Sequence, residues 1–367
     1  MSRFSHKYCI AHGADDVTEF LSLHLKKAAN VLFIGTVGVE VSSLYYANEL
    51  AGSENVQFRF FIEQRSDEST ALVDLGGLHQ NWLSRTIGND RCQFANVRII
   101  AEDGATVAGR NAAAAAAKWY EQGITDIVVD SSGMSRGVCF PVIRQAIEAG
   151  EQLGANVHLL TASNNLRAIR LDSQSNDRAD WMHGFQGNMS LDTMTNALQL
   201  WIPQLAEQGV IQMNIMYSHL SAGAPVAEVC PIVPFPALDT RRGDKLLFEY
   251  RQAFQVDWGN EHLNVIYAHE ADPMDVFRSI TRMELARREV FAATGKKAVS
   301  VLSPSGWRIG SLGMVLAAID LELPMLYVET IGYTTDSAPP ATIEIQKPER
   351  LWHIWLAGAP YADTTEF

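Results

Sequence analysis

The sequence has few cysteines, few cations and no long apolar run. Its 367 residues include four cysteines, and none of them forms a Cys-x-x-Cys pair. This pattern excludes a disulfide framework and a cysteine zinc site, and it is typical of reduced cytosolic thiols. No uninterrupted apolar run reaches membrane-spanning length, and residues 1–13 lack a signal-peptide pattern. We therefore expect a cytoplasmic protein with no membrane association.

Positive charge is scarce as well. Lysine and arginine number 29 against 42 acidic residues, which gives a formal net charge of −13 at pH 7. Binding to nucleic acid backbones depends on cations that neutralise phosphates, so we expect no general affinity for nucleic acids. A local basic pocket for a small anion is still compatible with this charge. Apolar residues make up 47% of the chain, enough for packed cores in two domains of ordinary size.

Known catalytic patterns are also missing. The sequence contains no Gly-x-Ser-x-Gly elbow, Walker loop or His-Glu-x-x-His motif, and it identifies no cofactor and no metal site. A few acidic residues and one histidine at the ends of expected strands are weak candidates for acid–base catalysis. These candidates are Glu40, Glu63, Asp130, His269 and Glu270.

Apolar strands alternate with helical segments along most of the chain. Clear strands are Asn30–Thr36, Val56–Glu63, Val97–Ala101, Ile127–Val129 and Val157–Thr161. This alternation predicts right-handed crossovers and an α/β fold of mostly parallel sheets with helices on both faces. We expect two Rossmann-like halves: an N-terminal domain over 1–165, a linker or lid over 166–209, and a C-terminal domain over 210–367.

The segments between and after these strands have less regular patterns. Arg65–Arg91 is polar, contains paired glycines and is predicted to be an irregular excursion from the sheet edge. Met194–Leu205 is predicted to be a helix, and Ile211–Tyr217 a strand. Asp272-Pro273 is a good helix start, with proline at the first helical position, and we favour a capping role for Asp272.

One stretch occurs twice. Ile127–Val138 and Val299–Leu312 both contain an apolar strand, a Ser-Gly turn, three residues, a glycine and a helix start. The preceding segments Asn96–Asp103 and Asn264–Asp272 are also alike, and their spacing to the turns is nearly the same. We interpret this as an internal duplication. The alternative is that any Rossmann-like half contains a strand, a glycine and a helix at roughly this spacing.

The two Ser-Gly turns contain groups that suit a phosphate, a ribose or a base. Ligands of open α/β sheets bind beyond the carboxyl ends of strands, where glycine permits close approach and the next helix offers free N–H groups. Hydroxyls and arginines suit phosphate, and tryptophan can stack on a base. The alternative is that the serines are helix N-caps and the arginines solvated. The candidates are Ser132, Gly133, Ser135, Arg136, Ser305, Gly306, Trp307 and Arg308.

Two other places are candidates for binding an anion. The first strand ends in Gly35-x-x-Gly38-x-Glu40, which departs from the dinucleotide fingerprint, and Glu40 opposes a phosphate there. Glu63 ends the second strand, where nicotinamide enzymes place an acidic residue on the ribose. Arg241 and Arg242 lie in a proline-stiffened loop and can contact an anionic ligand, form a partner surface or remain solvated.

The order of strand, small polar turn with glycine and a basic residue, helix and strand resembles the CRISPR-associated Rossmann fold (CARF) sensor family. The similarity covers Ala95–Ser163 and Leu263–Glu329. The Thr-Gly-Gly-Thr-Lys turn of that family is replaced by Ser-Gly-Met-Ser-Arg and Ser-Gly-Trp-Arg. The resemblance implies paired domains that bind a cyclic oligonucleotide across a two-fold axis, here as a fused pair. It also implies a role in prokaryotic antiviral defence.

The leading hypothesis is a cytosolic sensor or regulatory module that binds a nucleotide-type anionic ligand at the carboxyl ends of its strands. A homo-oligomer and association with other protein subunits are both compatible with it. One alternative is a nucleotide-using enzyme, such as a nucleoside or NAD glycosidase or a transferase. A further alternative is a structural subunit with vestigial clefts. The sequence does not choose the ligand.

Overall fold

The protein divides into two compact units that do not follow one another along the chain. In the computed structural model the described residues are 4, 10–164, 171–187, 197–222, 226, 228–259, 264–295, 298–336 and 342–362. The first unit consists of Met1–Gln174 and Thr330–Phe367, and the second consists of Ser175–Glu329. The second unit is therefore inserted into the first.

The first unit contains a seven-stranded sheet. Its parallel strands are β2 (Val31–Thr36), β3 (Val56–Gln64), β5 (Cys92–Arg98), β6 (Asp126–Asp130) and β7 (Asn156–Ser163). They lie in the order β5-β3-β2-β6-β7, which is the 3-2-1-4-5 order of a Rossmann-type sheet. Val31 of β2 pairs with Val56 on one side and with Asp126 on the other.

Two further strands extend this sheet beyond β7. β17 (Arg350–Ala357) pairs antiparallel with β7, and β1 (Ile10–His12) pairs antiparallel with β17. A small sheet of the order β4-β16-β8 is formed by β4 (Asp67–Glu68), β16 (Thr330–Thr334) and β8 (Asp172–Ser175). The chain's last segment thus returns to the first unit.

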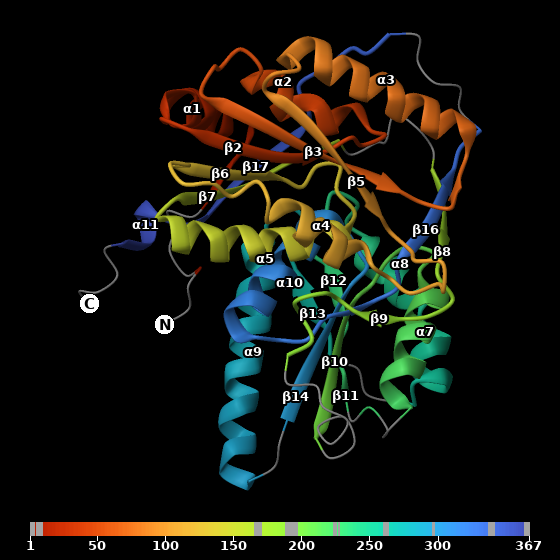
Figure 1. Ribbon diagram of the computed structural model, residues 1–367. Helices are drawn as coiled ribbons and strands as arrows, with labels where there is room; N and C mark the ends of the chain where they lie inside the picture. Colours follow the sequence, from red (N-terminus) through yellow and green to blue (C-terminus); the bar gives the residue numbers. More distant parts are fainter. Residues whose placement is uncertain are drawn as a thin grey trace. The chain divides into compact units, whose positions relative to one another are not determined.

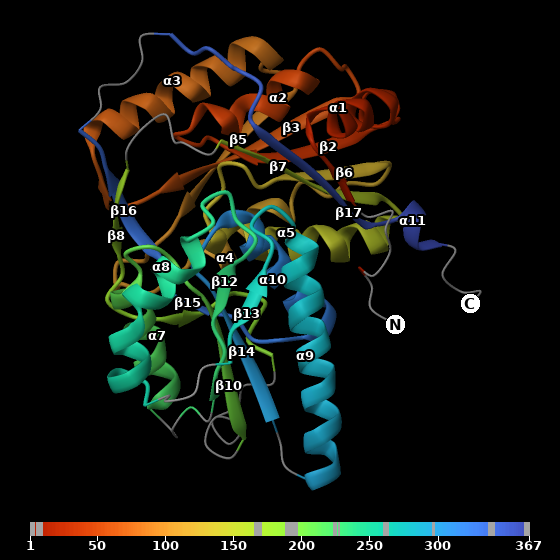
Figure 2. The same cartoon turned by 180° about the vertical axis from the view of Figure 1, so that it is seen from behind.

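Helices cover both faces of the seven-stranded sheet (Figures 1 and 2). One face carries α1 (Ala14–Leu23), α2 (Tyr45–Leu50) and α3 (Thr70–Ile87), with the short helices η2 (Leu25–Lys27) and η3 (Val41–Leu44). The other face carries α4 (Ala108–Ala116) and α5 (Arg136–Leu153), and α11 (Ala359–Ala362) follows β17. All six residues of β2 are buried, as expected for a strand covered on both sides.

The second unit repeats the strand order of the first. Its strands are β10 (Leu198–Gln204), β11 (Glu228–Val229), β12 (Ile232–Pro234), β13 (Ile266–Ala268) and β14 (Ala298–Pro304). β10 pairs in parallel with β14 on one side and with β11 and β12 on the other, and β13 pairs with β12. Met325 bridges in parallel to Leu302 of β14. With β11 and β12 taken as one interrupted strand, the order is again 3-2-1-4-5.

Helices cover both faces of this sheet too (Figure 1). They are α7 (Val210–Ser221) and α8 (Arg242–Glu249) on one face, with the π-helix η4 (Ala253–Asp257), and α9 (Pro273–Thr294) and α10 (Arg308–Leu321) on the other. β9 (Asp180–Trp181) pairs antiparallel with β15 (Leu326–Tyr327). The predicted α/β class with two Rossmann-like halves is therefore confirmed. Among the described residues, no helix combines the length and apolar character needed to cross a membrane.

Three predicted segments have a different structure. Residues 65–91 contain the regular helix α3, which buries Leu72, Leu75, Leu83 and Ile87 at helical spacing. The helix predicted over Met194–Leu205 is instead strand β10, fully buried from its second residue onward, although 194–196 lie outside the described residues. A run that is apolar on every side has no period to distinguish strand from helix.

The strand predicted over Ile211–Tyr217 is helix α7. Met213, Met216 and Leu220 are its buried residues, while Ile211 is 75% exposed. Spacings of three and four residues place the buried side chains on one face of a helix.

The division into units also differs from the predicted boundaries. β17 joins the first unit, and the predicted linker at 166–209 contains β9 and β10 of the second. Of that linker, 166–170 and 188–196 lie outside the described residues. The predicted boundary rests on the polar composition of the segment between the two halves. Composition does not reveal that the C-terminal strand β17 pairs with β7 of the first unit.

Candidate functional site

In the first unit, the turns that follow β2 and β6 lie against each other. β2 and β6 are neighbours at which the strand order reverses, the point where open α/β sheets bind ligands. A Cβ atom on Gly133 would lie 3.3 Å from Gly38 Cα and 2.7 Å from Ser43 Cβ. Gly38 and Gly133 therefore allow two backbone turns to pack closely. Gly35 fits a third close contact, because its Cβ would lie 3.0 Å from the rings of Phe33 and Phe60.

The serines of the first turn bind the neighbouring strand. The N–H of Ser132 donates to Asp130 Oδ1 at 2.9 Å, and its Oγ accepts from Ala162 N at 2.8 Å. Ser131 Oγ donates to Leu160 O at 3.1 Å. Asp130, Ser131 and Ser132 are all buried. They fix the turn to β7, which is a structural use of these polar groups.

Glu63 occupies the start of helix α5. Its Oε1 accepts from Ser135 N at 2.8 Å, and its Oε2 pairs with Arg65 Nη2 at 2.8 Å. The side chains of Glu63 and Arg65 are 10% and 3% exposed. A helix start favours anions because its N–H groups are free and its dipole is positive. The carboxylate of Glu63 thus lies where a ligand phosphate would bind. Arg136, the residue after Ser135 and the first residue of α5, is half-buried.

His79 of α3 lies beside the turn after β2. Its Nδ1 donates to Gly38 O at 2.6 Å, and the side chain is fully buried. Burial lowers the pKa of His79, and the bond to Gly38 O only partly offsets this effect, so the ring is neutral at pH 7. Glu40 directly precedes the short helix η3 in the same turn, and its carbonyl accepts from Ser43 N at 3.0 Å.

The buried polar atoms at this edge that lack a hydrogen-bond partner among the described residues include a hydroxyl oxygen and an imidazole nitrogen. They are Ser135 Oγ and His79 Nε2, and both atoms are buried. Because Nδ1 of His79 holds the proton, its Nε2 is an acceptor without a donor. Buried polar groups are nearly always paired, so an unpaired hydroxyl and an unpaired imidazole nitrogen at this edge require an explanation.

In the second unit, Gln204 holds the equivalent turn. Gln204 ends β10 and is fully buried. Its Oε1 accepts from Gly306 N at 3.2 Å and from Ser311 Oγ at 2.7 Å, while its Nε2 donates to Trp307 O at 3.0 Å. A Cβ on Gly306 would lie 2.5 Å from Leu205 O. As in the first unit, a side chain near the end of another strand of the sheet binds the helix start: Gln204 belongs to β10, which pairs directly with β14, whereas Glu63 belongs to β3, which is separated from β6 by β2.

The other candidates of the second turn are more enclosed than predicted. Trp307 is 9% exposed, and carbon atoms of its ring would lie within 2.7 Å of a Cβ on Gly310. Its Nε1 has no hydrogen-bond partner among the described residues. Ser305 and Arg308 are half-buried beside it. Packing on helix α10 accounts for the place of this ring without a stacked base.

Arg242 and Glu270 form an internal ion pair in the second unit. Arg242 Nε also binds Glu207 Oε1 at 3.1 Å, and Glu270 Oε2 accepts from Leu238 N at 2.9 Å. The pair therefore fixes the proline-rich loop to the end of β13. Arg241 is exposed.

The remaining candidates after β13 have local roles. His269 is exposed, and its Nδ1 accepts from Ala271 N at 3.0 Å. Asp272 caps α9 by accepting from Met274 N at 2.8 Å, which confirms the predicted capping role. The five acid–base candidates are divided between the units. Asp130, Glu63 and Glu270 each accept a backbone N–H, a role that fits anchoring better than proton transfer.

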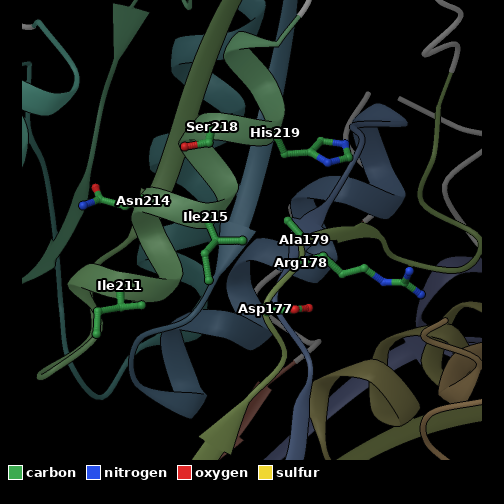
Figure 3. Close-up of a pocket in the computed structure, with 8 residues that line it drawn as sticks. All are labelled: Asp177, Arg178, Ala179, Ile211, Asn214, Ile215, Ser218 and His219. Atoms are coloured by element: carbon green, nitrogen blue, oxygen red, sulfur yellow. The ribbon is translucent and has the colours of Figure 1, made fainter. Parts of the chain in front are cut away.

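An open depression of about 560 Å³ lies elsewhere in the second unit, between residues 177–179 and helix α7 (Figure 3). Its lining residues are Asp177, Arg178, Ala179, Ile211, Asn214, Ile215, Ser218 and His219. It contains none of the predicted ligand-binding residues. The amide of Asn214 is already paired, because its Oδ1 accepts from Trp258 Nε1 at 2.8 Å and its Nδ2 donates to Asp257 Oδ2 at 3.3 Å.

Comparisons with known proteins do not assign a family. No family profile matches the sequence, and no curated protein matches it. Among solved structures, the chain is similar to the cytoplasmic domain of a prokaryotic cation chloride cotransporter. The identity is 10%, the match covers 82% of this chain and 95% of that one, and the TM-score is 0.23. A similarity at this level carries no conclusion about function.

Three residues of the site were not among the predicted ones. Arg65 lies just beyond β3, His79 lies in a segment expected to be irregular, and Gln204 ends a strand expected to be a helix. The position of Arg65 directly after a strand was a usable signal. For His79 and Gln204, the predicted secondary structure was wrong, so their positions in the sequence gave no such signal.

Proposed function

We propose that the chain is a regulatory module that binds a nucleotide-type anionic ligand in its first unit, between the turns that follow β2 and β6. The observation that carries the proposal is the carboxylate of Glu63 on Ser135 N and Arg65. A helix-start N–H and a buried guanidinium are the groups that bind a phosphate. The position is built for an oxyanion, and Glu63 provides one from within the chain.

The unpaired atoms support this proposal. Ser135 Oγ can donate to a phosphate oxygen, and His79 Nε2 can accept from a ribose hydroxyl. Both suit a nucleotide better than an inorganic anion. A ligand phosphate must displace Glu63, so the site has two states, with Glu63 bound or released. Such a two-state contact between β3 and α5 is what a regulatory protein needs to report occupancy.

The CARF resemblance makes the proposal more specific. It points to a cyclic oligonucleotide as the ligand and to a role in prokaryotic antiviral defence with other protein subunits. These parts rest on the Ser-Gly-Met-Ser-Arg turn and its counterpart in the second half. We favour binding over catalysis because the candidate carboxylates are anchored by backbone N–H groups.

The test is calorimetry and thermal unfolding with ATP, NAD and cyclic tetra-adenylate. We expect at least one of them to bind and to stabilise the chain, with no product by mass spectrometry. Arg136→Ala should weaken that binding about tenfold, because a charged contact to phosphate is lost. Arg144→Ala is the matched control, since Arg144 lies on the same helix in an exposed pair with Glu148. No binding across the panel, or equal effects of both variants, contradicts the proposal.

A further inference from the structure

Two histidines and an aspartate converge at the opposite edge of the first unit's sheet. Asp126 is the first residue of β6, His158 lies near the start of β7, and His24 follows helix α1. The Nε2 atoms of His24 and His158 lie 2.8 and 3.0 Å from Asp126 Oδ1. All three atoms lie within 4.8 Å of one another. Asp126 and His158 are buried, and the His24 side chain is 31% exposed.

Hydrogen bonding alone leaves this cluster with too many donors. Asn156 Nδ2 is a third nitrogen within 3.0 Å of Asp126 Oδ1. A carboxylate oxygen has about two lone pairs, so it does not satisfy three N–H donors fully. A cation held by Oδ1 and by the two Nε2 lone pairs removes the conflict, because the imidazoles then act as ligands and no longer donate. We propose that His24, Asp126 and His158 form a binding site for a divalent first-row metal ion of the zinc type.

The two separations from Asp126 Oδ1 fit such an ion. Two atoms bound about 2.0–2.1 Å from one ion are roughly 2.8–3.0 Å apart at right angles and about 3.4 Å apart at the tetrahedral angle. The distances from His24 Nε2 and His158 Nε2 to Asp126 Oδ1 agree with the right-angle value. A movement of the side chains by about 0.5 Å would give the tetrahedral value. Two imidazoles and one carboxylate are the ligands of metal sites that keep an open position. The partly exposed His24 leaves that position accessible to water.

Two of the ligands are oriented by a second layer of contacts. Thr125 Oγ1 donates to Asp126 Oδ2 at 2.7 Å, and His158 Nδ1 lies 3.1 Å from His353 Nε2. When Nε2 of His158 binds the ion, its Nδ1–H donates to His353. Metal-binding histidines are oriented in this way in most sites, and the partner fixes the tautomer.

Aromatic rings enclose the cluster. Phe20 stacks on His353 with ring centroids 3.6 Å apart, and Trp355 lies 4.8 Å from His24 and 4.7 Å from His158. These contacts restrict the imidazoles to their present orientation and limit the water around the buried ligands. The ion would connect α1, β6 and β7 at the amino ends of the strands. The site is therefore separate from the proposed nucleotide site, which lies at their carboxyl ends.

The experiment titrates zinc into the full, tag-free chain after treatment with EDTA, in competition with a chromophoric chelator. We expect one high-affinity zinc ion per chain, and Co²⁺ in its place should show the d–d absorption of a site with nitrogen and oxygen ligands. His24→Ala should weaken zinc binding at least tenfold. Because His24 is partly exposed, this variant should remain folded, as circular dichroism would show.

His269→Ala is the matched control, since His269 is an exposed histidine of the second unit. It should bind zinc as the wild type does. Asp126→Asn should lose binding like His24→Ala, and if it fails to fold, His24→Ala alone decides. High-affinity binding below one ion per chain, or equal affinity in wild type and His24→Ala, would overturn the proposal.

Discussion

At the scale of single residues, Glu63 shows why a strand-end carboxylate has more than one use. Its place near the end of β3 is where dinucleotide-binding sheets put an acidic residue on a ribose. Here it binds Ser135 N, which is 72 residues further along the chain, and Arg65. The sequence placed Glu63 at the edge where sites form. It did not reveal the partner, because that contact depends on β2 lying between β3 and β6.

The cluster of His24, Asp126 and His158 was not predictable for a related reason. Its members are separated by 102 and 32 residues, whereas sequence patterns for metal sites rely on ligands a few residues apart. The sequence therefore indicated no metal site. Only the neighbouring positions of β6 and β7, with α1 packed beside them, bring the three side chains together.

His79 makes the stability of the first unit depend on pH. Burial holds its pKa below the ordinary value of about 6.5, so the unfolded chain takes up the proton more readily. The contribution is complete above pH 6.5 and is lost as the pH falls, by up to about 1.4 kcal/mol at pH 5.5. Thermal unfolding at pH 7.5 and 5.5 should therefore show a smaller loss for His79→Asn, whose amide retains a donor for Gly38 O.

The exposed His269 provides the control for this prediction. His269→Asn should lose as much stability between the two pH values as the wild type does. If His79→Asn also behaves like the wild type, His79 does not titrate as described.

At the scale of elements, the glycines of the Ser-Gly turns are explained by packing. The sequence marked them as positions where the backbone approaches a ligand, whereas the group that approaches them in the structure is another turn of the same unit. In the first unit that group is Gly38, and in the second it is Leu205 O. A glycine after a strand can therefore make room for a ligand or for another turn of the same unit. Only the order of the strands in the sheet distinguishes these two roles.

Two glycine-to-alanine changes in the first unit should have opposite signs. Gly133→Ala places a methyl group 2.7 Å from Ser43 Cβ and 2.9 Å from Thr36 Cγ2, and it should destabilise the chain by about 1–3 kcal/mol. Gly76 lies inside α3 with nothing within 4 Å of its Cβ position. Gly76→Ala should therefore stabilise the helix by about 0.5–1 kcal/mol. Chemical denaturation measures both, and a neutral Gly133→Ala would contradict the described turn contact.

At the scale of the whole molecule, the repeated strand order is the main regularity. Two Ser-Gly turns and similar preceding segments were enough to predict two Rossmann-like halves, because both turns follow the fourth strand of a 3-2-1-4-5 sheet. The insertion of one unit into the other was not predictable. The apolar sequence of β17 indicates a strand. It does not indicate which sheet edge this strand joins, and in the structure it pairs with β7.

The central claim is that Glu63 occupies the phosphate position of a nucleotide site. Calorimetric titration of wild type, Glu63→Gln and Glu148→Gln with ATP, NAD and cyclic tetra-adenylate tests it most directly. Removing one buried negative charge from that position should tighten binding of at least one of these nucleotides about tenfold, or by about 1.4 kcal/mol. Glu148→Gln, the same change further along α5, should bind as the wild type does. Unchanged or weaker binding by Glu63→Gln, or no binding by any of the three proteins, would contradict the account.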